Sequence, residues 1–166
     1  TLGEEEARAV YETVRAGWVS MGKRVRDFEE RFASTVGTRH AVAVSNGTAA
    51  LHIALKLTGV ENNNEVITQS LTFVATCNAI RYCNAEPVFV DVCRDTLGLS
   101  PESMEQFLQE HCEVRNDGFC WNKMTDRVIR ACVPMHTFGF PVRLESLRHS
   151  VSMATKSSLT SRIKIV

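Results

Sequence analysis

Short apolar segments alternate with segments of helical spacing along most of this chain, and this alternation constrains the fold more than any other feature. We expect strands at 40–45, 65–68, 87–92 and 128–134, with helices at 48–57, 73–82 and 100–108 between them. Strands that alternate with helices predict an α/β fold, in which crossover helices connect the strands of a mostly parallel sheet.

The segment that precedes this pattern has a different character. Residues 4–16 have the spacing of an amphipathic helix, and so do residues 23–36, which end at Gly37. Glycine is the residue that most often follows the last turn of a helix. Between the two helices, residues 17–22 form a loop bounded by glycines.

The stretch from Val42 to Leu55 passes from an apolar strand through a turn of small residues into a helix. The first N–H groups of a helix have no partner inside it, and the helix dipole favours negative charge there. Gly47 lets the backbone approach a ligand closely, and Thr48 adds a hydroxyl donor. The junction therefore predicts an anion site, most naturally for a phosphate. An ordinary strand-to-helix turn is the alternative interpretation.

Several candidate site residues fall at the carboxyl ends of the expected strands. Ligands of parallel sheets bind beyond these ends. Residues 45–49, residues 70–73, Asp91 and His136 all lie at or near them. We therefore expect these positions to share one edge of the sheet.

Composition excludes several classes of function. The chain has 166 residues, and its 19 Lys and Arg balance its 19 Asp and Glu, which argues against a nucleic-acid binder or a polybasic membrane surface. Its apolar runs are too short for a transmembrane helix. The six cysteines include no C-x-x-C pair, and His111, Cys112 and Cys120 do not have the spacing of a zinc site. We expect no metal and a reduced, cytoplasmic protein.

Two segments interrupt the α/β rhythm. Residues 109–126 are interpreted as a polar excursion between a helix and the last long strand. Residues 148–166 are rich in Ser and Thr, carry basic but no acidic residues, and lack a clear helical stripe. We expect an atypical tail here, although 163–166 has the character of a strand.

Five motifs in order and spacing resemble the DegT–StrS family of sugar aminotransferases, which are fold-type I enzymes that use pyridoxal 5′-phosphate (PLP). The motifs are residues 17–22, 45–51, 72–76, 87–92 and 134–139. The last, Met135–Gly139, is most similar to the LegC-type branch, which acts on nucleotide-linked 4-keto sugars. The resemblance covers residues 1–147. It implies that they form part of a PLP-binding large domain with the aspartate-aminotransferase-like fold, followed by the tail at 148–166.

The resemblance also implies roles for individual residues. Thr48 and Ala49 would hold the cofactor phosphate, Phe73 would stack on the pyridine ring, and His136 would lie at the cofactor edge. Trp18 would approach an active site, that of the partner subunit in a homodimer. The implied cofactor-binding set is Gly47, Thr48, Ala49, Phe73 and His136. Asp91 is expected to have a structural or site-edge role.

Two groups that the family uses have no counterpart in matching context. One is the lysine that attaches the cofactor, and the other is the carboxylate that contacts the pyridine nitrogen. Lys156 and Lys164 lie outside any matching motif, so no catalytic residue is assigned. Family members are about twice as long or more. The matching sequence stops close to Leu147, where the Ser- and Thr-rich tail begins, so we expect a fragment, a frameshifted product or an alternative exon.

Two functions follow from the resemblance. The first is transfer of an amino group, from a donor such as glutamate, to a nucleotide-linked keto sugar in amino-sugar or surface-glycan synthesis, with this truncated chain inactive alone. The alternative is a non-catalytic homologue that binds PLP or phosphate weakly or associates with an intact subunit. A Rossmann-type nucleotide binder is disfavoured because no G-x-G-x-x-G follows a strand.

Overall fold

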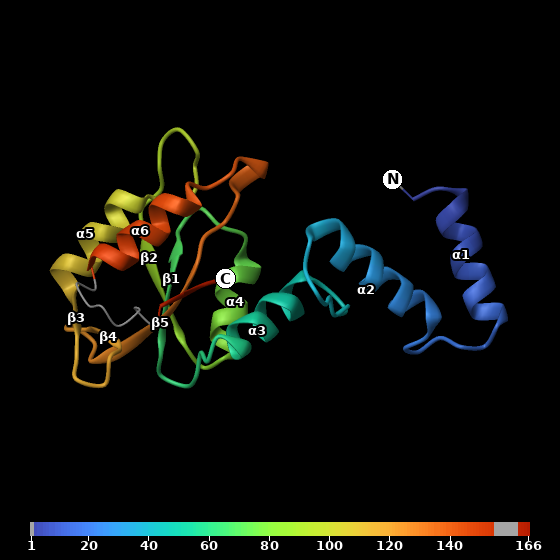
Figure 1. Cartoon of the computed structure of the whole chain (residues 1–166), viewed down its shortest axis with the longest axis horizontal. Coiled ribbons are helices and arrows are strands. Elements are labelled where there is room, and N and C mark those ends of the chain that lie inside the picture. Colours follow the sequence, from blue (N-terminus) through green and yellow to red (C-terminus); the bar gives the residue numbers. More distant parts are fainter. Residues whose placement is uncertain (1, 155–162) are drawn as a thin grey trace. The chain divides into compact units, whose positions relative to one another are not determined.

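The computed structural model of the chain describes residues 2–154 and 163–166, drawn in Figure 1. The chain divides into two compact units, Thr1–Ser45 and Asn46–Val166, and each is described by itself.

The first unit contains two helices, α1 (Glu4–Arg15) and α2 (Lys23–Val36), as the sequence predicts. At the start of α1, the Glu6 carboxylate accepts a hydrogen bond from the Gly3 amide, 2.6 Å away. At the end of α2, Gly37 adopts φ 71°, a left-handed conformation that glycine reaches without a steric penalty. Both helix ends thus form for local reasons that are visible in the sequence.

The strand expected at 40–45 is wrong, because this segment has no regular secondary structure. β propensity depends on pairing and packing more than on the backbone itself. Within residues 2–45 no strand is available as a partner, and the Val42 side chain is 79% exposed. The Ala43 amide instead donates to the Glu29 carboxylate at 2.8 Å.

The second unit has the α/β architecture that the alternation predicts. Its longer elements are α3 (Gly47–Leu57), β1 (Glu65–Gln69), α4 (Val74–Tyr82), β2 (Glu86–Val90), α5 (Pro101–His111), β5 (Arg127–Val133) and α6 (Leu144–Ala154). Its shorter ones are β3 (Cys112–Val114), β4 (Cys120–Asn122), the 3-10 turn η1 (Thr137–Gly139) and β6 (Lys164–Ile165). None of the helices in the described ranges combines the length and apolar character needed to cross a membrane.

The strands form one mixed sheet in the order β2-β1-β5-β4-β3. Strands β2, β1 and β5 run parallel, and β6 also pairs in parallel with β5. The hairpin of β3 and β4 adds the antiparallel edge. The parallel centre places the carboxyl ends of β1 and β5 side by side.

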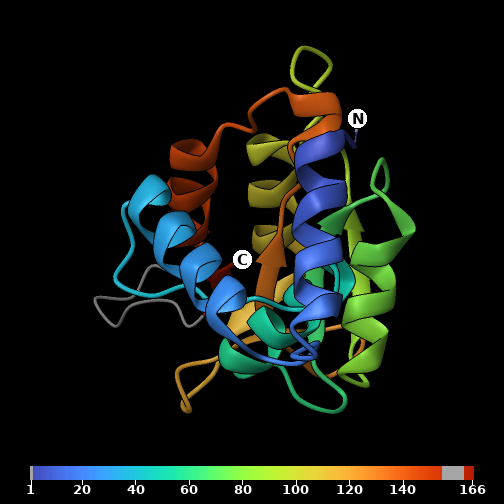
Figure 2. The ribbon, with the colours of Figure 1, turned by 90° about the vertical axis from the view of Figure 1, so that its right-hand side faces the viewer.

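Two helical layers cover the sheet, with α5 and α6 on one face and α4 on the other, as Figure 2 shows. Adjacent residues of β1 point to opposite faces. Ile67 belongs to the core that includes Met104 of α5 and Leu147 of α6, whereas Val66 belongs to the core with Leu55 of α3 and Ile80 of α4. This alternation is the pattern of a strand buried on both sides.

Two segments differ from expectation. Residues 109–126, interpreted as a polar excursion, complete α5 to His111 and then form the β3–β4 hairpin, which belongs to the sheet. Helix α6 continues to Ala154, where the sequence shows no clear stripe. Leu147 and Val151 supply its apolar contacts, and the buried Ser150 hydroxyl is accommodated by donating to a backbone carbonyl, that of Ser146 or that of Pro101. The strand character of 163–166 is confirmed by β6, while Lys156 lies outside the described residues.

Candidate functional site

A cavity of about 520 Å³ lies in the second unit, bordered by the start of α3, the start of α4 and the segment after β5. It brings together four of the residues singled out from the sequence, namely Gly47, Thr48, Phe73 and His136. The remaining lining residues are Leu51, Ala75, Thr76, Val133, Pro134, Met135 and Val166. The expected convergence is therefore present for these four residues, although Gly47 and Thr48 follow an irregular segment instead of the strand expected at 40–45.

The start of α3 gives this cavity its polar side. The Asn46 side chain caps the helix by accepting a hydrogen bond from the Ala49 amide at 2.9 Å. Gly47 and Thr48 belong to the first helical turn, whose N–H groups lack intrahelical partners. A Cβ atom added to Gly47 would meet no atom within 4 Å apart from those of its chain neighbours and its own helix turns, so the space beside it is open. This is a backbone cradle suited to an anion.

Ala49 borders a neighbouring pocket rather than the main cavity. That pocket of about 430 Å³ is lined by Asn46, Thr48, Ala49, His52 and Tyr82. The rings of His52 and Tyr82 meet edge to face with centroids 5.8 Å apart. Thr48 borders both pockets, so the first turn of α3 separates them.

Phe73 forms an apolar wall of the main cavity. It stands immediately before α4, and its side chain is 69% exposed. A core aromatic at a helix start would be buried, so this exposure favours a ligand-facing ring. The neighbouring Thr72 hydroxyl lies 3.2 Å from the Met135 sulfur, which ties this wall to the segment after β5. A flat aromatic face there can cover a flat heterocycle.

His136 also lines the cavity, and a backbone amide holds its ring in place. Its Nδ1 accepts a hydrogen bond from the Val142 amide at 3.0 Å. A nitrogen that accepts carries no proton, so the neutral imidazole holds its proton on Nε2. Nε2–H is therefore a hydrogen-bond donor available to a ligand.

Gln69 and Thr137 are part of the site's framework, and sequence reasoning missed them. Both are buried, and the Gln69 amide donates to the Thr137 hydroxyl at 2.8 Å. The signal in the sequence is weak, a glutamine that ends a short strand in which polar and apolar residues are mixed. A buried polar side chain needs hydrogen-bond partners, but the sequence does not say where they lie.

Asp91 follows β2 and does not line the cavity. Its carboxylate accepts a hydrogen bond from the Val92 amide at 2.8 Å, and its backbone carbonyl accepts one from Ser100. These contacts support the structural role that the sequence suggests.

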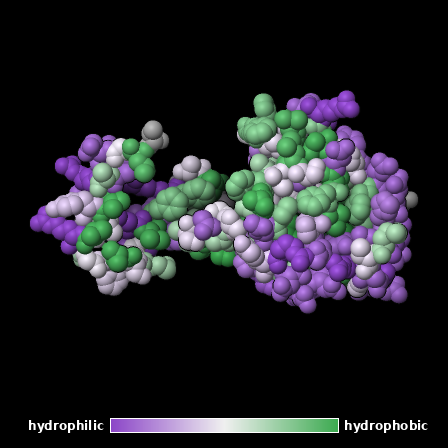
Figure 3. Space-filling model, turned by 180° about the vertical axis from the view of Figure 1, so that it is seen from behind, coloured by the Kyte–Doolittle hydropathy of each residue, from purple (hydrophilic) through white to green (hydrophobic). Residues whose placement is uncertain are grey.

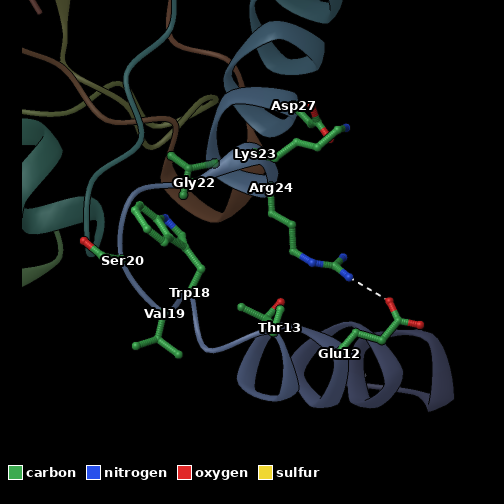
Figure 4. A pocket seen from close by; sticks show the side chains of 11 residues that line it. Glu12, Thr13, Trp18, Val19, Ser20, Gly22, Lys23, Arg24 and Asp27 are labelled. Carbon is green, nitrogen blue, oxygen red and sulfur yellow. Dashed lines mark hydrogen bonds and ion pairs between the residues drawn. The ribbon is translucent and has the colours of Figure 1, made fainter.

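Trp18 lies in the first unit, where it borders a hollow of about 760 Å³ between α1 and α2 (Figure 4). Its indole N–H donates to the Met21 carbonyl at 2.8 Å. A Cβ at Gly22 would lie 2.7 Å from the indole ring, so this packing requires glycine there. The Arg24–Glu12 ion pair, with 2.8 Å between its atoms, crosses from α2 to α1. Trp18 and the main cavity thus belong to different units.

The cysteines are reduced and mostly buried. Burial raises the pKa of the Cys132 thiol to about 12. A hydrogen bond with Cys120, followed by burial, raises the pKa of Cys112. Across residues 2–154 and 163–166, no group of three or more His, Cys, Asp or Glu side chains is placed to bind a metal ion.

The chain is similar in sequence and in fold to several known proteins. The chain is 47% identical to the spore coat polysaccharide biosynthesis protein SpsC of Bacillus subtilis over 104 residues, which are 63% of this chain and 27% of that protein. A sugar aminotransferase from Streptococcus pneumoniae, Spr1654, solved with bound PLP, matches 92% of this chain and 35% of its own with a TM-score of 0.76 and 25% identity. An aminotransferase from Psychrobacter cryohalolentis matches 93% of this chain and 35% of its own, with a TM-score of 0.76 and 27% identity.

The chain spans about a third of the length of these relatives. The family model itself matches residues 1–159, beyond the 147 residues that the motifs cover. The chain belongs to the DegT/DnrJ/EryC1/StrS aminotransferase family.

Proposed function

We propose that this chain is part of a PLP-dependent sugar aminotransferase and that the cavity beside α3 holds the cofactor. The observation that carries this proposal is the convergence of Gly47, Thr48, Phe73 and His136 on one cavity. They come from three separate segments and supply an anion cradle, an aromatic wall and a hydrogen-bond donor.

The residues fit the cofactor in its chemistry. The first turn of α3 would hold the phosphate through backbone amides and the Thr48 hydroxyl, with the Ala49 amide shared between Asn46 and the ligand. The open space beside Gly47 allows a phosphate oxygen to approach the backbone. The first turn of α3 contains no acidic residue that would repel an anion.

The aromatic ring of the cofactor would lie against Phe73, and His136 would donate Nε2–H to an oxygen or nitrogen at its edge. When bound, PLP carries the amino group between donor and acceptor while its ring withdraws electrons from the reacting centre. The residues of this chain would orient that ring and exclude water from its faces. The attaching lysine and the carboxylate for the ring nitrogen are not assigned to any residue of this chain.

We further propose a nucleotide-linked keto sugar as amino acceptor and an amino acid such as glutamate as donor, with LegC-type enzymes as the model. The names of SpsC, a polysaccharide biosynthesis protein, and of Spr1654, a sugar aminotransferase, support a sugar substrate. Similarity to the family supports a cytoplasmic homodimer in which Trp18 approaches the partner's active site. Residues 1–147 would then be the cofactor-binding part, followed by a divergent segment at 148–166.

Equilibrium dialysis of the 166-residue chain against PLP, followed by borohydride reduction and peptide mapping, tests this proposal. We expect saturable binding of about one PLP per chain, with inorganic phosphate as a competitor. Binding without a lysine adduct would assign this chain the non-catalytic role of cofactor binding. A stoichiometric adduct at one lysine, with turnover of an amino donor, would contradict that role. No saturable binding would contradict the cofactor proposal.

A further inference from the structure

Gln69 is a buried polar residue that connects three loops at the carboxyl edge of the sheet. It is the last residue of β1 and has 0% exposure. Its Nε2 lies 2.9 Å from the Leu71 carbonyl, 3.1 Å from the Leu97 carbonyl and 2.8 Å from the Thr137 hydroxyl. Its Oε1 accepts from the Met135 amide at 3.1 Å. One side chain thus contacts the loops that follow β1, β2 and β5.

The orientation of this amide follows from its partners. The Met135 N–H can only donate, so the oxygen of Gln69 faces Met135 and the nitrogen faces the acceptors. The Thr137 hydroxyl donates in turn to the Leu97 carbonyl at 2.9 Å. The network therefore has a defined direction, and an apolar side chain of the same size would remove the Gln69 partner of the Met135 amide and of the Leu71 carbonyl.

Two residues next to this network have backbone conformations that side chains rarely adopt. Leu97 has φ 55° and Phe138 has φ 53°, both in the left-handed region. Such conformations persist where surrounding contacts impose them. The carbonyl of Leu97 accepts from both Gln69 and Thr137, and Phe138 directly follows Thr137. The network is thus placed to hold both loops in strained shapes.

We infer that Gln69 is a positioning residue that fixes the two walls of the cavity relative to each other. Its contact at Leu71 lies two residues before Phe73, and its contact at Met135 lies next to His136. The start of α3, by contrast, makes no hydrogen bond with Gln69 among those that the structure describes. Gln69 therefore positions the two walls that carry Phe73 and His136, and it does not position the first turn of α3, where the phosphate would bind. This inference rests on the proposed function of the cavity.

The test compares Gln69→Met, which keeps the side-chain length, with Thr137→Val, which removes only the hydroxyl. Ile67→Val is the matched control, because Ile67 is equally buried in β1 but packs into the core without entering the network. For each variant, affinities for PLP and for inorganic phosphate are measured separately. We expect both network variants to weaken PLP binding at least tenfold and phosphate binding less than twofold, and the control to change neither. Equal losses for the two ligands would show a general structural role and overturn the inference.

A second readout is independent of the ligand. Amide hydrogen exchange in the ligand-free chain should accelerate at least tenfold at Met135 in Gln69→Met, while the Ile67 amide inside β1 changes less than twofold. An unchanged Met135 amide would overturn the inference even if the wild-type chain binds no PLP. Absence of PLP binding by the wild-type chain, with the expected exchange at Met135, would contradict the proposed function alone. If Gln69→Met does not fold, the affinities of Thr137→Val for PLP and for inorganic phosphate still test the inference.

Discussion

At the start of α3, Thr48 lines the cavity and carries a hydroxyl that would add a donor to the proposed anion site. A hydrogen bond to a charged group contributes about 1.5–3 kcal/mol, so loss of the hydroxyl should weaken phosphate binding roughly tenfold or more. We therefore expect Thr48→Val to lower the affinity for PLP by this factor in equilibrium dialysis.

Thr58 provides the matched control at the opposite end of the same helix. Its hydroxyl donates to the Leu55 carbonyl at 2.8 Å and lies far from the cavity. Thr58→Val should leave the affinity for PLP unchanged. Equal loss of binding in both variants would show that helix stability, rather than the Thr48 hydroxyl, is responsible.

The buried thiol of Cys132 makes the free energy of unfolding depend on pH in the alkaline range. Burial raises the pKa of its thiol from about 9 to about 12 in the folded chain. The unfolded chain loses this proton above pH 9 while the folded chain keeps it, so stability falls as pH rises from 9 to 12. A pKa shift of this size lowers the free energy of unfolding by about 4 kcal/mol once the pH has reached the upper end of this range.

Urea unfolding at several pH values measures this effect. The wild-type chain should lose more stability between pH 8 and pH 10.5 than Cys132→Val does, because the variant has no proton to release at this position. Parallel pH profiles for the two proteins would contradict the account of Cys132.

At the scale of elements, α6 shows how far the fold extends beyond the recognisable motifs. Val151 is buried against the core that includes Met104 and Leu108 of α5. Removal of two buried methyl groups costs about 2 kcal/mol. We expect Val151→Ala to lower the free energy of unfolding by this amount and Met153→Ala, at an exposed position of the same helix, by less than about 0.5 kcal/mol. Similar small values for both would mean that α6 does not pack as described.

The sequence predicts the central elements well because their signals are local. Strands β1, β2 and β5 have apolar runs, and α5 has Ser100 as a cap that accepts from the Ser103 amide at 3.1 Å. The segment 40–45 has the same apolar character but lacks a partner strand, and pairing is a property of the fold rather than of the segment. The sequence does not predict helix α6, because Ser150 interrupts the apolar stripe of this helix. The Ser150 hydroxyl finds its hydrogen-bond acceptor only in the folded chain.

Some residues of the candidate site can be predicted from local motifs, and others can be found only in the folded structure. Gly47, Thr48, Phe73 and His136 lie in motifs that can be read along the chain, and the structure places them around one cavity. Apart from Leu71, the side-chain partners of Gln69 and Thr137 lie 28 to 68 residues away in sequence, so no local pattern predicts these contacts. Trp18 lies in the separate first unit, and its approach to a neighbouring active site stays a prediction.

For the molecule as a whole, the surface carries many exposed large apolar side chains. Figure 3 shows apolar side chains gathered over part of the visible face of the sheet-bearing unit, with hydrophilic side chains around them. Large apolar side chains more than half exposed in this unit include Leu57, Val74, Tyr82, Phe89, Phe138 and Phe140. Exposed apolar side chains that gather on one face commonly mark an association site. We expect sedimentation velocity to show concentration-dependent association, and a monomer at every concentration would contradict the proposed homodimer.

The measurement that tests the central claim most directly is an NMR titration of the isotope-labelled 166-residue chain with PLP. The account predicts saturable shifts of the Gly47 and Thr48 amides, the Phe73 ring and the His136 imidazole, with inorganic phosphate reproducing only the shifts at α3. Residues around the Trp18 hollow serve as the internal reference. Shifts confined to other surfaces, or no shifts at millimolar PLP, would contradict the assignment of this cavity as the cofactor site.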